Sequence, residues 1–260
     1  MINQCILFVK NNMVIKKRVL WFKTISFFLE DINNTEYLKG NYSKIFILSY
    51  DKLSFADFKV GQKKTPLINL DKNKEDIFNS FNDTAKKKIR RSERNEDLKF
   101  VIEDKNLKEA YQVYANHVYG YKKVPDNIET LRDMKIFSAY YKNEMIANII
   151  CYYSPKFLRA KAICSKRFDE LDKEKTKIIS MASCRLVWEI CKYGIENGYR
   201  AFDLGSINIK DEKRSGAAQF KKSFNVDIID EYYYVYKSPF FEFLQKFVNI
   251  KLVFYKIFKL

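Results

Sequence analysis

The alternation of strand-like and helix-like segments after residue 98 is the feature that most restricts the fold of this chain. LKFVIED predicts a strand, and apolar residues spaced three and four apart over 107–118 predict a helix behind an Asn106/Glu109 capping pair. KIFSAYY and EMIANIICYY predict a hairpin turning near Lys142. A strand at 157–164, a helix carrying Ile178, Ala182, Leu186 and Ile190, a strand at 199–204, a helix at 216–224 and the run VDIIDEYYYVY complete the order. We therefore expect a mixed α/β fold, with helices on both faces of a largely central sheet.

The first 95 residues carry weaker signals. Apolar runs at 19–22 and 45–48 predict short strands between polar loops. Asp71 or Asn73 can cap a helix carrying Ile77, Phe78 and Phe81. That helix leads into a basic run, Lys86, Lys87, Lys88, Arg90, Arg91 and Arg94, with Ile89 as its one large apolar residue. The run suits either a solvated helix face or a clamp for phosphate groups, which Arg binds in bidentate fashion.

Composition narrows the classes of function. The net charge of +16 draws polyanions, phosphorylated substrates or anionic lipid to the surface, although lysine-rich composition alone explains part of it. Five cysteines without a CxxC spacing and one histidine, His117, indicate neither a disulfide framework nor a metal centre. No apolar stretch approaches the roughly 18 residues of a spanning helix, and the N-terminus does not resemble a secretory signal. We expect an intracellular, cytoplasmic protein.

The stretch FDLGSINIKDEKRSGAAQFKKSF, residues 202–224, looks like the edge of a site. Phe202 and Leu204 bracket a single acid, Asp203, and Gly205 ends the apolar run where the backbone must turn or be closely approached. A basic, aromatic helix follows. The alternative is a plain strand end followed by a solvated amphipathic helix.

At these residues the chain resembles the Fem-type aminoacyltransferases, a branch of the GNAT acyltransferase superfamily. Asp203 to Ser206 correspond to the family's DxGG turn, and Phe220, Lys221 and Phe224 correspond to its FKxxFGG motif. The segment TPLINLDKNKEDIFNSFNDTAKKKIRRSERN resembles the junction between the family's two GNAT-like halves. The resemblance covers about residues 65–237. It implies a GNAT-like mixed central sheet flanked by helices, with a shortened GNAT-like N-terminal domain.

Three departures from the family pattern bear on the ligand. Ser206 stands in place of the second glycine of the turn, and Asn225 and Val226 replace the glycines after Phe224. The glycine-rich pyrophosphate loop of coenzyme A-dependent GNAT enzymes is absent from KEKTKIISMASC, as is typical of the Fem-type branch. The resemblance therefore implies no tightly bound cofactor, and either aminoacyl-tRNA or acyl-CoA as the donor substrate.

The expected domain division follows from the same comparison. Residues 1–95 would form the shortened N-terminal domain with its basic connecting helix, and residues 96–237 the GNAT-like acyltransferase domain. Residues 238–260 would form a basic amphipathic tail, with Lys246, Lys251, Lys256 and Lys259 among aromatic and aliphatic residues. The tail suits either a membrane interface or packing on the N-terminal domain, to which the family's C-terminal segment returns.

The resemblance also assigns roles to residues. In GNAT-like folds two neighbouring central strands splay apart and free backbone groups that hold the donor; here they would be the strands at 157–164 and 199–204. Lys221 would neutralise a developing oxyanion or a phosphate, and Asp203 would orient the amine, act as base, or simply hold the Gly205 turn. Gly205, Ser206 and Phe220 would line the substrate. The diphosphate of the acceptor would meet Lys88, Arg90, Arg91 and Arg214.

The leading hypothesis is therefore acyl or aminoacyl transfer to an amine of a cell-envelope precursor, in peptidoglycan or surface polysaccharide synthesis. The acceptor would be a nucleotide-linked or lipid-linked sugar, tRNA would be a further partner, and the tail would place the protein at the inner face of the plasma membrane. Two alternatives remain open at this stage. One is an acetyl-CoA-dependent N-acetyltransferase, and the other is a noncatalytic module that binds nucleic acid through residues 86–94.

Overall fold

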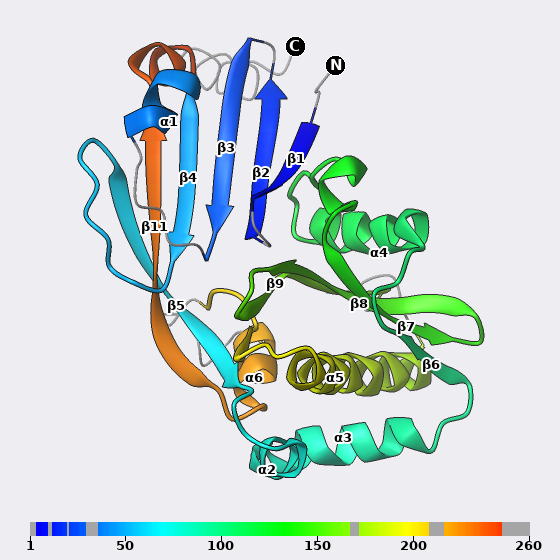
Figure 1. The fold of residues 1–260 in the computed structure, drawn as a ribbon. Helices are drawn as coiled ribbons and strands as arrows, with labels where there is room; N and C mark the ends of the chain where they lie inside the picture. The colour runs from blue at the N-terminus through cyan, green and yellow to red at the C-terminus, as the bar shows by residue number, and fades with distance from the viewer. Residues whose placement is uncertain are drawn as a thin grey trace. The chain divides into compact units, whose positions relative to one another are not determined.

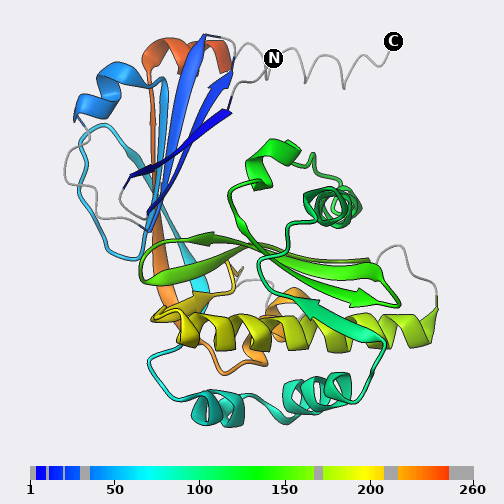
Figure 2. The same ribbon diagram turned by 45° about the vertical axis from the view of Figure 1, so that its right-hand side comes forward.

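The computed structural model describes residues 4–9, 12–19, 21–29, 36–166, 172–207 and 216–245. The chain divides into two compact units (Figures 1 and 2), one made of Met1–Gln62 with Glu231–Leu260 and the other of Lys63–Asp230. Strands β5 (Lys59–Asn69) and β11 (Asp227–Lys237) each cross a boundary between the units. This division differs from the expected one, because the basic helix belongs to the unit that contains the GNAT-like motifs, and residues from 231 onward return to the first unit.

The sheet of the 63–230 unit has the strand order β5-β10-β9-β8-β7-β6. Its further strands are β6 (Leu98–Val101), β7 (Lys135–Tyr141), β8 (Glu144–Tyr153), β9 (Phe157–Ser165) and β10 (Ala201–Asp203). Neighbouring strands pair antiparallel except β9 and β10, which are parallel. The sheet is therefore mixed, as expected.

Helices cover both faces of this sheet (Figure 1). The helices of the unit are α2 (Lys74–Ser80), α3 (Asp83–Glu93), α4 (Leu107–Gly120), the 3-10 turn η1 (Ile128–Leu131), α5 (Lys173–Glu196) and α6 (Gly216–Lys222). One face contacts α4, which packs on β8 and β9, and the other contacts α5, which packs on β7 to β10. Helices α2 and α3 lie against α5.

Helix α5 forms the centre of the core. Ala182, Leu186 and Ile190 of the predicted stripe are buried, and full burial of one leucine side chain contributes roughly 2 kcal/mol. Asp172 caps its first turn by accepting from the Glu174 amide at 2.8 Å. The helix ends at Glu196, and Gly198, with φ of +74°, takes the left-handed position after it.

The segment 71–94 forms two helices. Asn73 caps α2 and Asn82 caps α3, each with its side-chain oxygen on a backbone amide three residues on. Between them Phe81 has extended backbone, and its ring packs edge-on against Trp188 and Phe224. The break falls at Phe81 and Asn82, whose extended backbone lets the Asn82 side chain cap α3 while Phe81 stays buried.

The other unit contains a smaller sheet of order β1-β2-β3-β4-β11. Its strands are β1 (Gln4–Val9), β2 (Asn12–Val19), β3 (Phe22–Phe28), β4 (Lys44–Ser49) and the second half of β11, and β3 and β4 are parallel. A short helix, α1 (Glu36–Asn41), precedes β4. Tyr234 is fully buried at its centre, and its hydroxyl accepts from the Leu53 amide at 2.6 Å.

The described part of the C-terminal segment packs within this unit. Residues 239–245 are helical, and the rings of Phe240 and Phe241 lie 6.0 and 5.1 Å from that of Phe22. This agrees with the return to the first unit that the resemblance implied. The four tail lysines from Lys246 onward lie outside the described residues. Among the described helices, none is both long enough and apolar enough to cross a lipid bilayer.

Candidate functional site

Strands β9 and β10 part where the sequence placed the site. They pair over three positions only, ending at Asp203 opposite Arg159, whereas β9 continues to Ser165. After Asp203 the chain leaves β9, and the Leu204 amide donates to the Pro66 carbonyl of β5 at 2.9 Å. Among the described residues no further β9–β10 pairing follows. The backbone of β9 beyond Arg159 is thus released from β10, as the resemblance implied.

A β-bulge lies just beyond the point of parting. In the pairing of β8 with β9, Cys151 faces Ala160 and Ile150 faces Ala162, so Lys161 is the extra residue. A bulge bends its strand and redirects the inserted side chain. Strand β10 therefore leaves β9 opposite Arg159, and β9 itself bends at Lys161, two residues further on.

The carboxylate of Asp203 holds the turn at the end of β10. This residue is fully buried, and it accepts hydrogen bonds from the Gly205 amide at 2.7 Å, the Thr65 hydroxyl at 2.5 Å and the Arg159 guanidinium. Arg159 is itself buried, so the two charges offset each other away from water. This is the turn-holding role among those expected for Asp203. Its roles as a base and as a group orienting the amine stay predictions.

Gly205 is required by its geometry. Its φ is +79°, a region that residues with a side chain seldom adopt, and a Cβ there would lie 2.9 Å from the backbone oxygen of Ala160. The turn therefore brings its backbone against β9 at the parting point. Ser206, in the place of the family's second glycine, lies 3.4 Å from the Arg159 guanidinium through its hydroxyl.

Lys221 joins the two motifs. Its ammonium group donates to the carbonyl oxygens of Gly205 at 2.8 Å and Ser206 at 3.0 Å, so FDLGS and FKKSF meet although 15 residues separate Ser206 from Lys221. Asn225 adopts the left-handed conformation, with φ of 49°, where the family pattern has glycine. Asparagine tolerates that conformation better than most residues, which explains how the departure is accommodated.

The remaining predicted site residues lie elsewhere or outside the description. Phe220 packs on the core, with its ring 5.1 Å from that of Phe224. Arg90 and Arg91 are exposed on α3, and the Arg90 guanidinium lies 5.5 Å from the ring centre of Phe78. Because α5 lies between α3 and the sheet (Figure 1), the structure does not bring Lys88, Arg90 and Arg91 to the Asp203 turn. Arg214 lies outside the described residues. The ligand roles of these five residues stay predictions.

Arg159 and Lys161 are the site residues that sequence reasoning missed. The Lys161 ammonium donates to Asp126 at 2.6 Å and to the Tyr152 hydroxyl at 3.3 Å, and it lies over the ring of Tyr114. Burial opposes its charge, yet the neighbouring carboxylate and phenol groups outweigh burial and raise the pKa of Lys161. A signal was present, because LRAKAIC places two cations within an otherwise apolar strand.

Four of the cysteines lie in the core. Cys151, Cys164, Cys184 and Cys191 are buried free thiols, and burial raises the pKa of each. His117 is largely withdrawn from water, which lowers its pKa. These groups are held in their neutral forms by the low polarity around them.

Known proteins resemble this chain in fold alone. No family model matches the sequence, and no curated protein matches it. Among solved structures, FemX aligns with a TM-score of 0.56 at 11% identity, covering 100% of this chain and 90% of that one. L-PGS from Bacillus licheniformis aligns with a TM-score of 0.55 at 14% identity, covering 91% of this chain and 85% of that one.

A third structure supports the same fold. It is the C-terminal domain of a lysylphosphatidylglycerol synthetase from Agrobacterium fabrum, with a TM-score of 0.53 at 12% identity and coverage of 95% of this chain and 88% of that one. Each likeness extends over nearly the whole of both chains. The mixed α/β fold that the sequence motifs implied is confirmed, and it is similar to that of FemX.

Proposed function

We propose that this chain is an acyltransferase that moves an acyl or aminoacyl group onto an amine of a cell-envelope precursor. The observation that carries the proposal is the meeting of Lys221 with the Gly205 and Ser206 carbonyls, beside the parting of β9 and β10. It unites a fixed cation, a tight turn and a strand end released from its neighbour at one place in a Fem-type fold.

Acyl transfer to an amine requires few catalytic groups. A neutral amine forms a bond to the acyl carbon, the bond from that carbon to the donor oxygen or sulfur breaks, and the amine loses a proton. Positioning of the two substrates and stabilisation of the tetrahedral oxyanion supply most of the acceleration in such reactions. No serine or cysteine nucleophile is needed.

The chain's own residues supply those two functions in the proposal. Released backbone groups of β9 hold the donor, and the Lys221 cation stabilises negative charge that develops near the turn. Asp203 and Arg159 act as positioning residues. Their buried ion pair holds the conformation of the turn, and the carbonyl oxygens of that turn accept the hydrogen bonds of Lys221. The proposal needs no tightly bound cofactor.

Aminoacyl-tRNA is the donor we favour, with acyl-CoA as the alternative. The net charge of +16 suits a polyanionic donor. The acceptor would be a nucleotide-linked or lipid-linked precursor, and the name of one structural neighbour, a lysylphosphatidylglycerol synthetase, fits an amino-acid transfer at a lipid surface. The protein would then work in the cytoplasm, at the inner face of the plasma membrane.

A donor screen with a lysine variant tests the proposal. Purified protein is incubated with charged tRNA or acyl-CoA and with envelope precursors bearing a free amine, and products and retained ligands are identified by mass spectrometry. We expect transfer from one donor class and a loss of about 100-fold or more in Lys221→Met, since removing one oxyanion-stabilising group costs that much. Circular dichroism should show an unchanged fold.

Two variants sharpen the result. Lys221→Arg keeps the cation and should retain part of the activity. Lys222→Met removes the exposed charge next to it in sequence and should leave turnover within about twofold, because salt screens an exposed charge. Full turnover in Lys221→Met would remove this residue from the site. RNA binding that falls steeply with salt, without transfer from either donor, would replace the proposal with the nucleic-acid module.

A further inference from the structure

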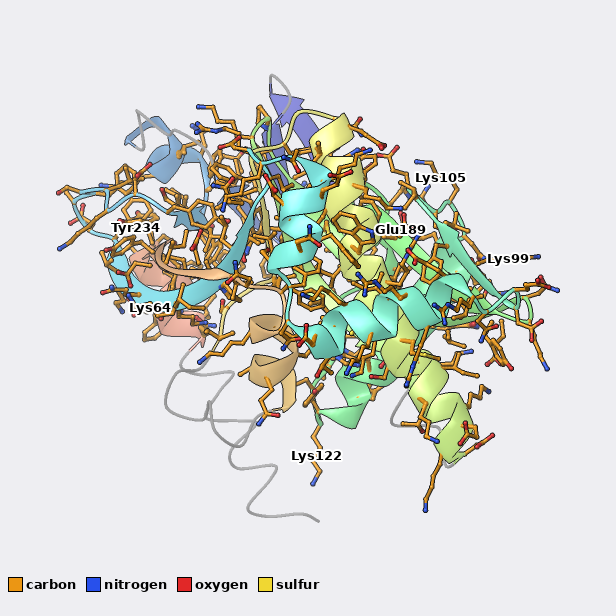
Figure 3. All side chains as sticks on the ribbon, turned by 90° about the horizontal axis from the view of Figure 1, so that it is seen from below. Lys64, Lys99, Lys105, Lys122, Glu189 and Tyr234 are labelled. Carbon is orange, nitrogen blue, oxygen red and sulfur yellow. The ribbon has the colours of Figure 1, made fainter. Side chains whose placement is uncertain are left out.

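The segment between α4 and η1 exposes an unusual set of side chains. In the 119–124 loop, defined here as Tyr119-Gly-Tyr-Lys-Lys-Val124, the exposed fractions of Tyr119, Tyr121 and Val124 are 60%, 52% and 89%. Lys122 and Lys123 between them are also exposed, and Figure 3 shows Lys122 directed away from the ribbon. Single exposed apolar residues are ordinary, but two tyrosines and a valine gathered on six residues are not.

The loop is well ordered by backbone hydrogen bonds. The Lys122 amide donates to the Tyr119 carbonyl at 2.7 Å, and the Lys123 amide donates to the Val118 carbonyl at 3.2 Å. This is the Schellman arrangement that ends many helices, in which the left-handed residue is usually glycine. Here Lys122 occupies it with φ of 56°. A lysine in this conformation has a conformational cost that a glycine would not have.

The charge of the loop has one sign. Lys122 and Lys123 are its ionisable cations, and it contains no acid. The nearest acid along the chain, Asp126, already bonds the Lys161 ammonium at 2.6 Å. On α4 the exposed positions that lead to the loop, Lys108 and Gln112, add no negative charge. The loop therefore presents a positive, partly apolar surface.

From these observations we infer that the 119–124 loop contacts an anionic lipid bilayer. Tyrosine rings settle at the boundary between headgroups and acyl chains, and lysine side chains extend to reach anionic headgroups beside them. Val124, the most exposed of the three apolar side chains, gains from leaving water in a bilayer. An RNA backbone would take up the lysine charge but would give this aliphatic side chain no partner.

The loop is tied to the candidate site through a short path. Asp126 lies two residues beyond Val124 and bonds Lys161, the bulge residue of β9. The Tyr114 hydroxyl of α4 lies 3.2 Å from the same Asp126 carboxylate. A bilayer that receives the loop therefore lies beside the strand that parts from β10. In this respect the inference rests on the proposed function, because it makes the acceptor a lipid-linked amine reached at the membrane surface.

Vesicle binding by the full chain tests the inference. The vesicles are pure phosphatidylcholine or a mixture with 30% phosphatidylglycerol, and binding is measured by co-sedimentation at low and physiological salt. We expect binding to the anionic vesicles, weakened about tenfold or more by Lys122→Gln with Lys123→Gln, since one lysine near an anionic surface is worth about fivefold. Tyr119→Ser with Val124→Ser should weaken the binding that remains at physiological salt.

A matched control separates the loop from the general charge of the protein. Lys72→Gln with Lys87→Gln removes the same charge from exposed positions beside α2 and on α3. We expect this control to change vesicle binding by less than about twofold, because the charges it removes lie away from the bilayer. An equal loss in both double variants would overturn the inference, since charge alone would then explain the binding.

A local reporter gives an independent reading. In Tyr121→Trp, lipids brominated near the headgroup should quench the added fluorescence, and Lys99→Trp on exposed β6 should show no such quenching. Absence of quenching at position 121 on bound vesicles would refute the contact. A tRNA mixture that loses affinity for the loop variants while vesicles do not would make the loop an RNA surface instead.

Transfer to a soluble amine acceptor separates the two proposals. If the loop variants lose vesicle binding but keep this activity, both proposals hold. If wild-type protein transfers in solution but does not bind vesicles through the loop, the inference fails alone. If the loop binds and no donor is used, the proposed function fails alone.

Discussion

Single residues at the turn after β10 show what motif reasoning captures and what it omits. Asp203 and Gly205 were identified from their local pattern and Lys221 from the family resemblance, and the structure brings all three together. Arg159 and Thr65, which bond the Asp203 carboxylate, were not identified. They lie 44 and 138 residues away along the chain, and no spacing rule connects residues that meet only through the pairing of strands.

Gly205→Ala is the substitution that tests this turn. It forces a side chain into the left-handed region and against the Ala160 oxygen, so we expect a loss of about 2–4 kcal/mol in the free energy of unfolding. Denaturant unfolding measures the loss. Gly216→Ala is the control, because a Cβ there meets nothing within 4 Å, and it should be neutral or slightly stabilising. Equal stability of the two variants would contradict the close approach of the turn to β9.

Among the elements, the β7–β8 hairpin was predicted well and the short helices less well. The polar residues at 142–144 indicated a turn, and the structure makes it with Lys142 and Asn143, both left-handed with φ of 50° and 66°. Strand β10 proved shorter than the apolar run at 199–204, because pairing with β9 and β5 ends at Asp203. The split between α2 and α3 falls at Asn82, which caps α3 although apolar periodicity continues from Ile77 to Phe81.

The hairpin itself offers a stability test. Two left-handed residues form the turn type that prefers Asn-Gly, so Lys142→Asn with Asn143→Gly should raise the free energy of unfolding by about 0.5–1 kcal/mol. Thermal or urea unfolding of the double variant measures the gain. Lys142→Val is the opposing control, since a β-branched residue resists this conformation and should destabilise. A destabilised Asn-Gly variant would show that Lys142 contributes more through its side chain than through its backbone.

On the scale of the whole molecule, the chain forms two compact units with boundaries that composition did not reveal. The sequence indicated a division near residue 95, yet α2 and α3 lie against α5 and so belong to the 63–230 unit. The larger unit buries four thiols, and partly buried tyrosines, Tyr141, Tyr153, Tyr193 and Tyr199, pack against its core. Such groups link stability to pH.

Alkaline pH should therefore weaken the fold. Burial raises the pKa of Cys184 from 9.0 to about 11 and that of Tyr199 from 10.0 to about 12. The folded state then holds protons that the unfolded chain releases, so the free energy of unfolding falls as pH rises above about 9. For Cys184 alone the loss would be about 2–3 kcal/mol by pH 11. Urea unfolding between pH 8 and 11 measures it.

The matched comparison is Cys184→Ala, which should show a shallower decline over the same range, because the variant has one ionisable thiol fewer. An identical slope in wild type and variant would mean that this thiol does not contribute to the pH dependence. A rise in stability toward pH 11 would contradict the burial of the thiols altogether.

The sequence by itself determined the mixed α/β class, the order of elements from residue 98 and caps such as Asn73 and Asn106. These follow from local chemistry, since side-chain periodicity, turn residues and helix caps act over a few neighbours. The two motifs of the site were identified through the family resemblance. The tertiary structure decided which strands part, which cations stand beside Asp203, and where the units divide. Those outcomes depend on strand pairing and core packing between residues far apart in the chain. The buried Asp203–Arg159 pair forms only when β9, β10 and their covering helices come together.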